Sequence, residues 1–330
     1  NEEKFTMKKL FNIFVVSFAL VFSSSVFANK IGVVYDSGGK FDKSFNELAF
    51  RTAERVKNEL GWDMVEFESS NDAQIEQGMR KIADRGATMI VGMGFAQADA
   101  VAAVSADYPD IKFVAVDVCW LDDPNNNIYQ ACYKEHEGSF LVGMMAAMAS
   151  KSGTIGFVGG MDIPLIRKFQ GGYEQGAQYV NPDIEVLANM TGTTNEAWNN
   201  PTKGAELTKT QIDGGADVVY QAAGGTGIGV LQAAADAGIM GIGVDANQNW
   251  MHPGNMLTSM LKRLDLTIFA QAEAIAAGTF EPSGQFLSLG LAEGGVGYAT
   301  EDGMVTDEMA AAADAAAADI ASGAIVVADW

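Results

Sequence analysis

Acidic and aromatic side chains recur where the sequence changes from a strand pattern to a helical pattern. Asp36 follows the apolar run IGVVY, while Asp117 and Asp245 follow KFVAV and GIGV in the same way. Phe45 and Asn46 open the helical stretch after Asp36. Carboxylates accept hydrogen bonds from hydroxyl and amino groups, and aromatic rings stack on flat rings. These residue types predict noncovalent recognition of a small molecule that carries a ring.

The second half of the chain offers further candidates at corresponding places. Trp198 lies in a polar loop, where we expect an exposed side chain free to touch a ligand, and Phe169 is the alternative second aromatic residue. Gly225 and Thr226 follow a strand pattern in AAGGTGIG, and Lys262 ends the pattern MLTSMLK. Each candidate also has a structural interpretation. An Asp after a strand is commonly a helix cap, and Phe45 has the spacing of a core residue.

Sequence motifs typical of catalysis, cofactor binding or metal binding are weak in this chain. The stretch GGTGIGV resembles a dinucleotide-binding fingerprint, but Val230 occupies the position of the third glycine. The 2 histidines, His136 and His252, are not at metal-ligand spacing, and no Ser-His-Asp context surrounds them. We therefore expect a binding protein with no metal and no cofactor. A nucleoside-processing or nicotinamide-dependent enzyme is the less favoured alternative.

The elements that must position these residues occur twice. Residues 63–117 read as strand, helix, strand, helix and strand, and residues 183–245 repeat that order. The opening strands also match, with KIGVVYDSGG answered by TIGFVGGMD. Strands that alternate with helices predict parallel sheets covered by helices, so the chain is of the α/β class with two similar Rossmann-like lobes. Ligands of such sheets collect at the carboxyl ends of the strands.

The start of the chain predicts export. Met7 and two lysines precede the apolar run LFNIFVVSFALVF, and small residues follow, with cleavage expected after Ala28. A transmembrane anchor is the alternative. Because no Cys stands at the cleavage point, we expect a periplasmic protein without a lipid anchor. The net charge of −21 disfavours nucleic acid and anionic membranes as partners.

Two cysteines, Cys119 and Cys132, flank the short segment WLDDPNNNIYQA. In an oxidising compartment a disulfide that closes this loop is expected. Two buried thiols on neighbouring strands are the alternative interpretation.

Several longer motifs resemble one family. The segments DSGGKFDKSFNE, YKEHEGSFLVG, IRKFQGGYEQGA, AAGGTGIGV, GIGVDANQ and LAEGGVGYA occur in that order. They resemble the basic membrane protein (BMP) family of purine-nucleoside receptors of ABC importers, over residues 30–300. The resemblance implies a monomer that captures a nucleoside such as adenosine, guanosine or inosine and delivers it to a membrane permease. A sugar or autoinducer-type receptor on the same fold remains the alternative.

The resemblance also implies a type I periplasmic-binding-protein fold with a three-segment hinge. The first lobe would comprise residues 29–135 and 263–291, and the second residues 136–262 and 292–330. The crossings between lobes would fall near Glu135, Lys262 and Leu291. Asp36 and Phe45 would contact the base, Asp245 and Lys262 the ribose, and Asp117, Gly225 and Thr226 would line the same cleft.

Overall fold

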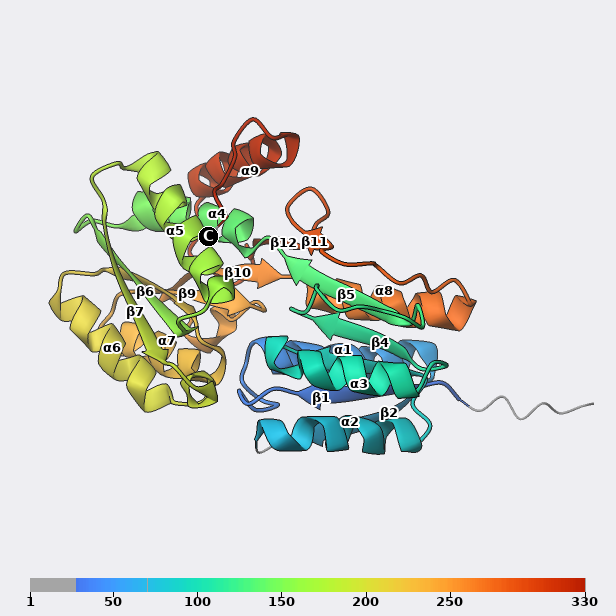
Figure 1. Ribbon diagram of the computed structural model, residues 1–330. Coiled ribbons are helices and arrows are strands. Elements are labelled where there is room, and N and C mark those ends of the chain that lie inside the picture. Colours follow the sequence, from blue (N-terminus) through green and yellow to red (C-terminus); the bar gives the residue numbers. More distant parts are fainter. Residues whose placement is uncertain (1–27, 70, 330) are drawn as a thin grey trace, which may run out of the picture.

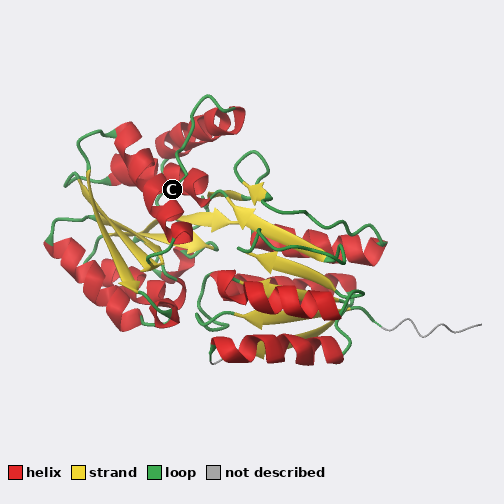
Figure 2. Ribbon diagram, viewed as in Figure 1, coloured by secondary structure: helices red, strands yellow, loops and turns green. Residues whose placement is uncertain are grey.

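A computed structural model of the chain describes residues 28–69 and 71–329. The predicted signal peptide, residues 1–28, lies outside the described residues except for Ala28. Within the described part the strands form two six-stranded sheets, each covered by helices on both faces (Figures 1 and 2). This arrangement confirms the predicted α/β fold with two lobes.

The first sheet has the strand order β11-β5-β4-β3-β1-β2, and its paired strands are parallel. Helices α1 and α8 pack together on one face, and α2 and α3 pack together on the other. The elements of this lobe are β1 (Lys30–Tyr35), α1 (Phe45–Leu60), β2 (Asp63–Glu68), α2 (Ile75–Asp84), β3 (Met89–Met93), α3 (Ala98–Asp107), β4 (Lys112–Val116), β5 (Ile128–Tyr133), α8 (Leu264–Ala277) and β11 (Ser288–Leu289), with the short 3-10 helices η1 (Asp72–Gln74) and η2 (Phe95–Gln97).

The second sheet repeats this arrangement in the order β12-β10-β9-β8-β6-β7. Its edge strand β12 departs from the parallel prediction, because it runs antiparallel to β10. The elements of this lobe are α4 (Glu135–Ala149), β6 (Thr154–Met161), α5 (Pro164–Val180), β7 (Glu185–Gly192), α6 (Pro201–Asp213), β8 (Val218–Ala222), α7 (Gly227–Asp236), β9 (Met240–Asp245), β10 (Met256–Lys262), β12 (Val296–Tyr298) and α9 (Asp307–Ser322), with η3 (Asn195–Trp198), η4 (Gly224–Thr226) and η5 (Asn249–Met251).

Burial on both faces explains the composition of the central strands. All five residues of β3, MIVGM, are buried. In β1, Ile31 and Val33 point to the core beneath α1, whereas Val34 points to the core beneath α2 and α3. A parallel strand that is covered on both faces needs a continuous apolar run, and β3 and β1 have one.

The described chain passes between the sheets at three places (Figure 1). It leaves β5 for α4, which packs on α5 and β10 of the second lobe. It returns from β10 to α8, which packs on α1, and it passes from β11 to β12. These passages bring Glu135, at the start of α4, and Lys262, at the end of β10, to the junction of the lobes.

The helix pair α4 and α5 is packed closely through glycines. A Cβ atom at Gly143 would lie 2.2 Å from the carbonyl oxygen of Tyr173, and one at Gly176 would lie 1.9 Å from the carbonyl oxygen of Phe140. Because glycine has no Cβ, the two backbones approach each other directly. Every residue from Glu135 to Ala146 is buried, including the polar residues of the first turn, so this helix is enclosed on all sides.

Cys119 and Cys132 form a disulfide, with Cα atoms 5.8 Å apart. The bridge joins the segment after β4 to the neighbouring strand β5. It lies in the first lobe, and neither cysteine lines the cavity between the lobes.

Candidate ligand-binding site

A cavity lies between the lobes, at the carboxyl ends of the central strands. Seven of the residues predicted from sequence line it, and they come from both sheets. These residues are Asp36, Phe45, Asp117, Phe169, Trp198, Asp245 and Lys262. The position agrees with the general location of ligand sites in open α/β sheets.

Asp117 and Asp245 occupy equivalent places in the two lobes. Asp117 follows β4 and Asp245 ends β9, the strand at the same position in the second sheet. Both have left-handed backbones, with φ of 62° and 63°. This conformation is uncommon for residues other than glycine and is often found at functional sites. The matching conformations turn the two carboxylates into the same cavity.

Lys262 is the buried cation of the site, with an exposed fraction of 1%. Its ammonium nitrogen lies 2.6 Å from Asp117 Oδ1 and 2.9 Å from Glu135 Oε1. Burial by itself would lower the pKa of Lys262, but the charges of Asp117 and Glu135 outweigh it and raise that pKa above its usual value. The lysine is therefore charged, and it joins a carboxylate of the first lobe to the end of a strand in the second.

Glu135 lies behind this ion pair and outside the cavity lining. Its side chain is fully buried, and neither carboxylate oxygen receives a well-directed hydrogen bond within the described part of the chain. Burial raises the pKa of Glu135 to about 6, although the charge of Lys262 opposes this change. From sequence, Glu135 was expected near a crossing of the chain between the lobes, and it was not assigned to the ligand site.

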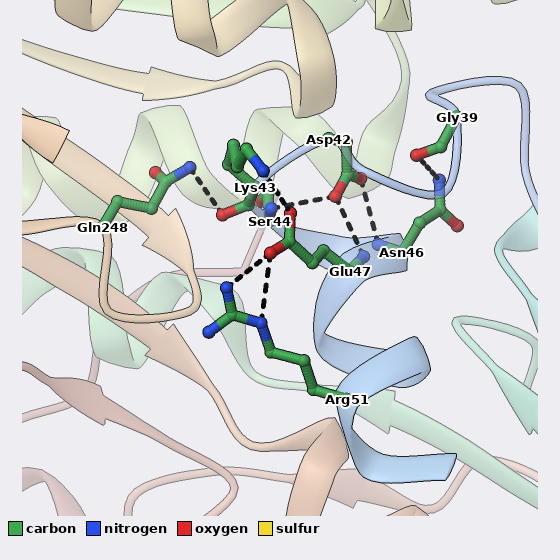
Figure 3. A network of polar contacts seen from close by, with 8 residues as sticks. All are labelled: Gly39, Asp42, Lys43, Ser44, Asn46, Glu47, Arg51 and Gln248. Atoms are coloured by element: carbon green, nitrogen blue, oxygen red, sulfur yellow. Dashed lines mark hydrogen bonds and ion pairs between the residues drawn. The ribbon is translucent and has the colours of Figure 1, made fainter. Parts of the chain in front are cut away.

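Asn46 supports Asp36 from behind. Its amide nitrogen donates to the carbonyl of Gly39, 3.2 Å away (Figure 3). The same nitrogen donates to the Asp36 carboxylate, and the amide oxygen accepts the backbone N–H of Asp36. These bonds direct the Asn46 side chain toward Asp36, and Asn46 is outside the lining of the cavity. Asp36 lines the cavity, and burial raises its pKa while Asn46 and Gly38 oppose that shift.

Aromatic side chains from both lobes line the cavity, and Phe95, in η2, is a fourth beside the three predicted from sequence. Phe45 opens α1, Phe169 lies in α5, and Trp198 ends η3. The expectation that Trp198 is exposed was wrong, because its ring is partly buried against the main core. A Cβ atom at Gly160 would lie 2.0 Å from this ring. The absence of a side chain at Gly160 thus gives the indole its place beside β6.

Gly225 and Thr226 lie just outside the cavity lining, and Gly224 lines it instead. The hydroxyl of Thr226 donates to the carbonyl of Ala197 at 2.7 Å and accepts the backbone N–H of Asn200 at 2.6 Å. Thr226 therefore fixes the loop that carries Trp198. Its effect on the cavity is indirect, through the position of that loop.

Other lining residues were missing from the sequence prediction. Some of these residues, such as Gly94, Phe95 and Gly224, closely follow strands, where the sequence predicts ligand contacts, but they were not assigned to the ligand. The additional lining residues are Ser37, Gly38, Asp42, Ile75, Gly94, Phe95, Ala96, Gln97, Leu165, Ile166, Asn195, Ala222, Gly224 and Val244. In the described residues no cluster of three or more His, Cys, Asp or Glu side chains is arranged to hold a metal ion.

The fold and the cavity define the class of solute-binding proteins of ABC transporters. A solved solute-binding protein of an ABC transporter system from Aeropyrum pernix has a TM-score of 0.81 and 27% identity, over 92% of this chain and 94% of that one. One from Conexibacter woesei has a TM-score of 0.73 and 26% identity, over 92% and 99%.

The family follows from the sequence. Residues 28–329 match the family described as ABC transporter substrate-binding protein PnrA-like, and this chain belongs to it, which confirms the resemblance. Basic membrane protein A2 of Borrelia garinii is 33% identical over 90% of this chain and 88% of its own length. The ABC transporter nucleoside-binding protein BmpA of Lactococcus lactis is 30% identical over 90% and 88%.

Two observations concern the relation to membranes. A relative from Pyrococcus furiosus, 33% identical over 83% of this chain and 71% of its own length, is named a lipoprotein. That name does not support the prediction that no lipid anchor is present. In residues 28–69 and 71–329, the helices are too short or too polar to span a bilayer.

Proposed function

We propose that this protein is the extracytoplasmic receptor of an ABC importer and that it binds a purine nucleoside between its lobes. The observation that carries the proposal is the composition of the cavity, in which four aromatic side chains line the same space as Asp36, Asp117, Asp245 and Lys262. Aromatic rings suit a base, and carboxylates suit ribose hydroxyls. The name of the Lactococcus relative adds support.

The proposed roles follow the positions of the side chains. Phe45 and Trp198 enter the cavity from opposite lobes, so each would cover part of the base when the lobes are closed. Asp36 would accept hydrogen bonds from the base. Asp245 and Lys262 would hold the ribose. Phe169 and Asp117 would complete the wall.

Capture would require no covalent step. The ligand contacts both lobes only when they are closed, so its binding energy favours the closed form. The chain between lobes would bend at its three passages, as hinge proteins do. The closed form, as a monomer in the periplasm, would then deliver the nucleoside to a membrane permease.

Calorimetric titration with adenosine, guanosine, inosine and uridine tests the ligand class. We expect saturable heat with at least one purine nucleoside and weaker binding of uridine. Ribose and galactose serve as controls for a sugar receptor. Binding of a sugar together with no heat from any nucleoside, at concentrations far above micromolar, would refute the proposed ligand.

A further inference from the structure

Ser44 occupies the position that normally caps the first helix, but its side chain does something else. Ser44 is the N-cap residue of α1, and in the described structure its hydroxyl makes no capping hydrogen bond. Asp42 performs that task, because its carboxylate accepts the backbone N–H groups of Ser44, Asn46 and Glu47 at 2.9, 3.0 and 3.1 Å (Figure 3). The capping function is therefore satisfied without the Ser44 hydroxyl, which is free for another partner.

The partner of that hydroxyl is in the other lobe. Ser44 Oγ lies 2.6 Å from Asp245 Oδ2 and 3.1 Å from the carbonyl oxygen of Val244. Ser44 is fully buried, and the exposed fraction of Asp245 is 7%. A hydrogen bond from a hydroxyl to a buried carboxylate is charge-assisted and stronger than a neutral one. Since Ser44 belongs to the first lobe and Asp245 to the second, the bond exists only when the lobes are closed.

A second hydrogen bond crosses beside it. Gln248 Nε2 donates to the carbonyl oxygen of Lys43 at 3.0 Å (Figure 3). Gln248 is fully buried and is fixed within its own lobe, because Gln221 and the backbone of Val244 donate to its amide oxygen at 2.8 and 2.9 Å. Lys43 has a left-handed backbone, with φ of 64°. The structure thus holds an unfavourable backbone conformation at the point of contact.

We propose that Ser44 is a positioning residue: with the Gln248 contact it forms a latch that stabilises the closed arrangement of the lobes, and it fixes Asp245 in its ligand-binding orientation. Ser44 itself is outside the cavity lining, whereas Asp245 lines it. The latch therefore ties the geometry of a ligand-binding carboxylate to lobe closure. The part concerning Asp245 rests on the proposed function, and the part concerning closure does not.

The test of closure uses ligand-free protein. In small-angle X-ray scattering, Ser44→Ala should give a larger average radius of gyration than the wild type, because loss of the latch lowers the closed fraction. Ser150→Ala is the matched control, because Ser150 Oγ also lies 2.6 Å from a carboxylate, that of Asp217, but within one lobe. Its scattering should equal that of the wild type. Identical curves for Ser44→Ala and the wild type would overturn the latch.

The test of positioning uses calorimetry with the purine nucleoside that binds best. Ser44→Ala should weaken binding about tenfold, the size expected for one lost hydrogen bond to a charged group. Ser44→Thr, which keeps the hydroxyl, should restore most of the affinity, and Ser150→Ala should bind normally. In an Asp245→Asn background, Ser44→Ala should cost much less than in the wild type. Equal losses in both backgrounds would overturn the positioning role, and failure of every nucleoside to bind would leave the scattering result decisive for the latch.

Discussion

The Lys262 ammonium nitrogen lies 2.6 Å from the Asp117 carboxylate, although the two residues end strands of different sheets. Both side chains are almost fully buried, and both line the cavity. The contact is therefore an ion pair between lobes at the place where a ligand would bind. The ion pair balances the charge of Asp117 inside the protein. The carboxylates of Asp36 and Asp245, which also line the cavity, are not part of this pair.

Replacing Lys262 should destabilise the protein, because buried carboxylates would lose their cation. Lys262→Met removes the cation that faces Asp117 and Glu135, and leaving a buried charge unpaired costs about 3–5 kcal/mol. Denaturant unfolding at pH 7 should show a loss of that size. Arg263→Met is the control, because Arg263 pairs with Asp265 in a more exposed position, and its loss should be about 1 kcal/mol or less.

The same variant should depend on pH in a defined direction. Without the ammonium, the main charge that opposes the effect of burial on Glu135 is lost, so the pKa of Glu135 in the folded state rises further above its unfolded value. The folded state then binds more protons, so the deficit of Lys262→Met should shrink as the pH falls from 7 to 5. A deficit that is constant over this range would contradict the assignment of its cause to unpaired carboxylates.

Ligand binding should weaken in mild acid because of Asp245. Burial raises the pKa of Asp245 to about 6, while the charge of Lys262 and the hydrogen bond from Ser44 oppose this shift. The carboxylate is the better acceptor for ribose hydroxyls, so the affinity for a ribonucleoside should fall between pH 7 and pH 5. Calorimetry at both values measures the change.

Asp245→Asn separates this effect from the titration of Glu135, whose pKa is also about 6 and which faces Lys262 from outside the cavity lining. The variant should bind ribonucleosides about tenfold more weakly at pH 7 and should lose most of its pH dependence. A free purine base should be little affected. An unchanged pH profile in Asp245→Asn would assign the dependence to Glu135 instead.

Gly160 should affect ligand binding indirectly, because it allows the ring of Trp198 to occupy its position. In Gly160→Ala the new methyl group would lie about 2 Å from the ring of Trp198, so the ring must move. Nucleoside affinity should fall toward that of Trp198→Ala, for which we expect a loss of about 1–3 kcal/mol. Gly297→Ala, in β12 of the same sheet, is the control, since no described atom lies within 4 Å of its added methyl group. Normal binding by Gly160→Ala would show that the position of Trp198 is unimportant.

The disulfide should stabilise the protein without affecting binding. The paired replacement Cys119→Ser and Cys132→Ser should lower the free energy of unfolding by about 3 kcal/mol, as expected for a loop with a sequence separation of 13. Nucleoside affinity should remain within a factor of about two, because the sulfurs are outside the cavity lining. Labelling of unfolded, unreduced wild type should detect no free thiol, and two reactive thiols per chain would contradict the bridge.

Much of the architecture and part of the site were predictable from local patterns. Apolar runs such as MIVGM predict strands that are buried on both faces, and the repeated order of elements predicts two lobes. Asp117 and Asp245 could be assigned to one cavity because the carboxyl ends of parallel strands are where ligand sites form. The strand patterns and the carboxylates at strand ends each depend on one element and the loop that follows it. The sequence by itself therefore determined these features.

The contacts across the lobes were decided only by the tertiary structure. Ser44 has the sequence position of a cap, yet Asp42 takes its place, and the Ser44 hydroxyl meets Asp245 instead. Within single lobes, too, Asn46 faces Asp36 rather than the cavity, and Glu135 meets Lys262 although the two are far apart in the sequence. Spacing along one helix or strand predicts which of its own faces is buried. It does not specify which side chain of the other lobe lies opposite, because that depends on how two separately folded sheets come together.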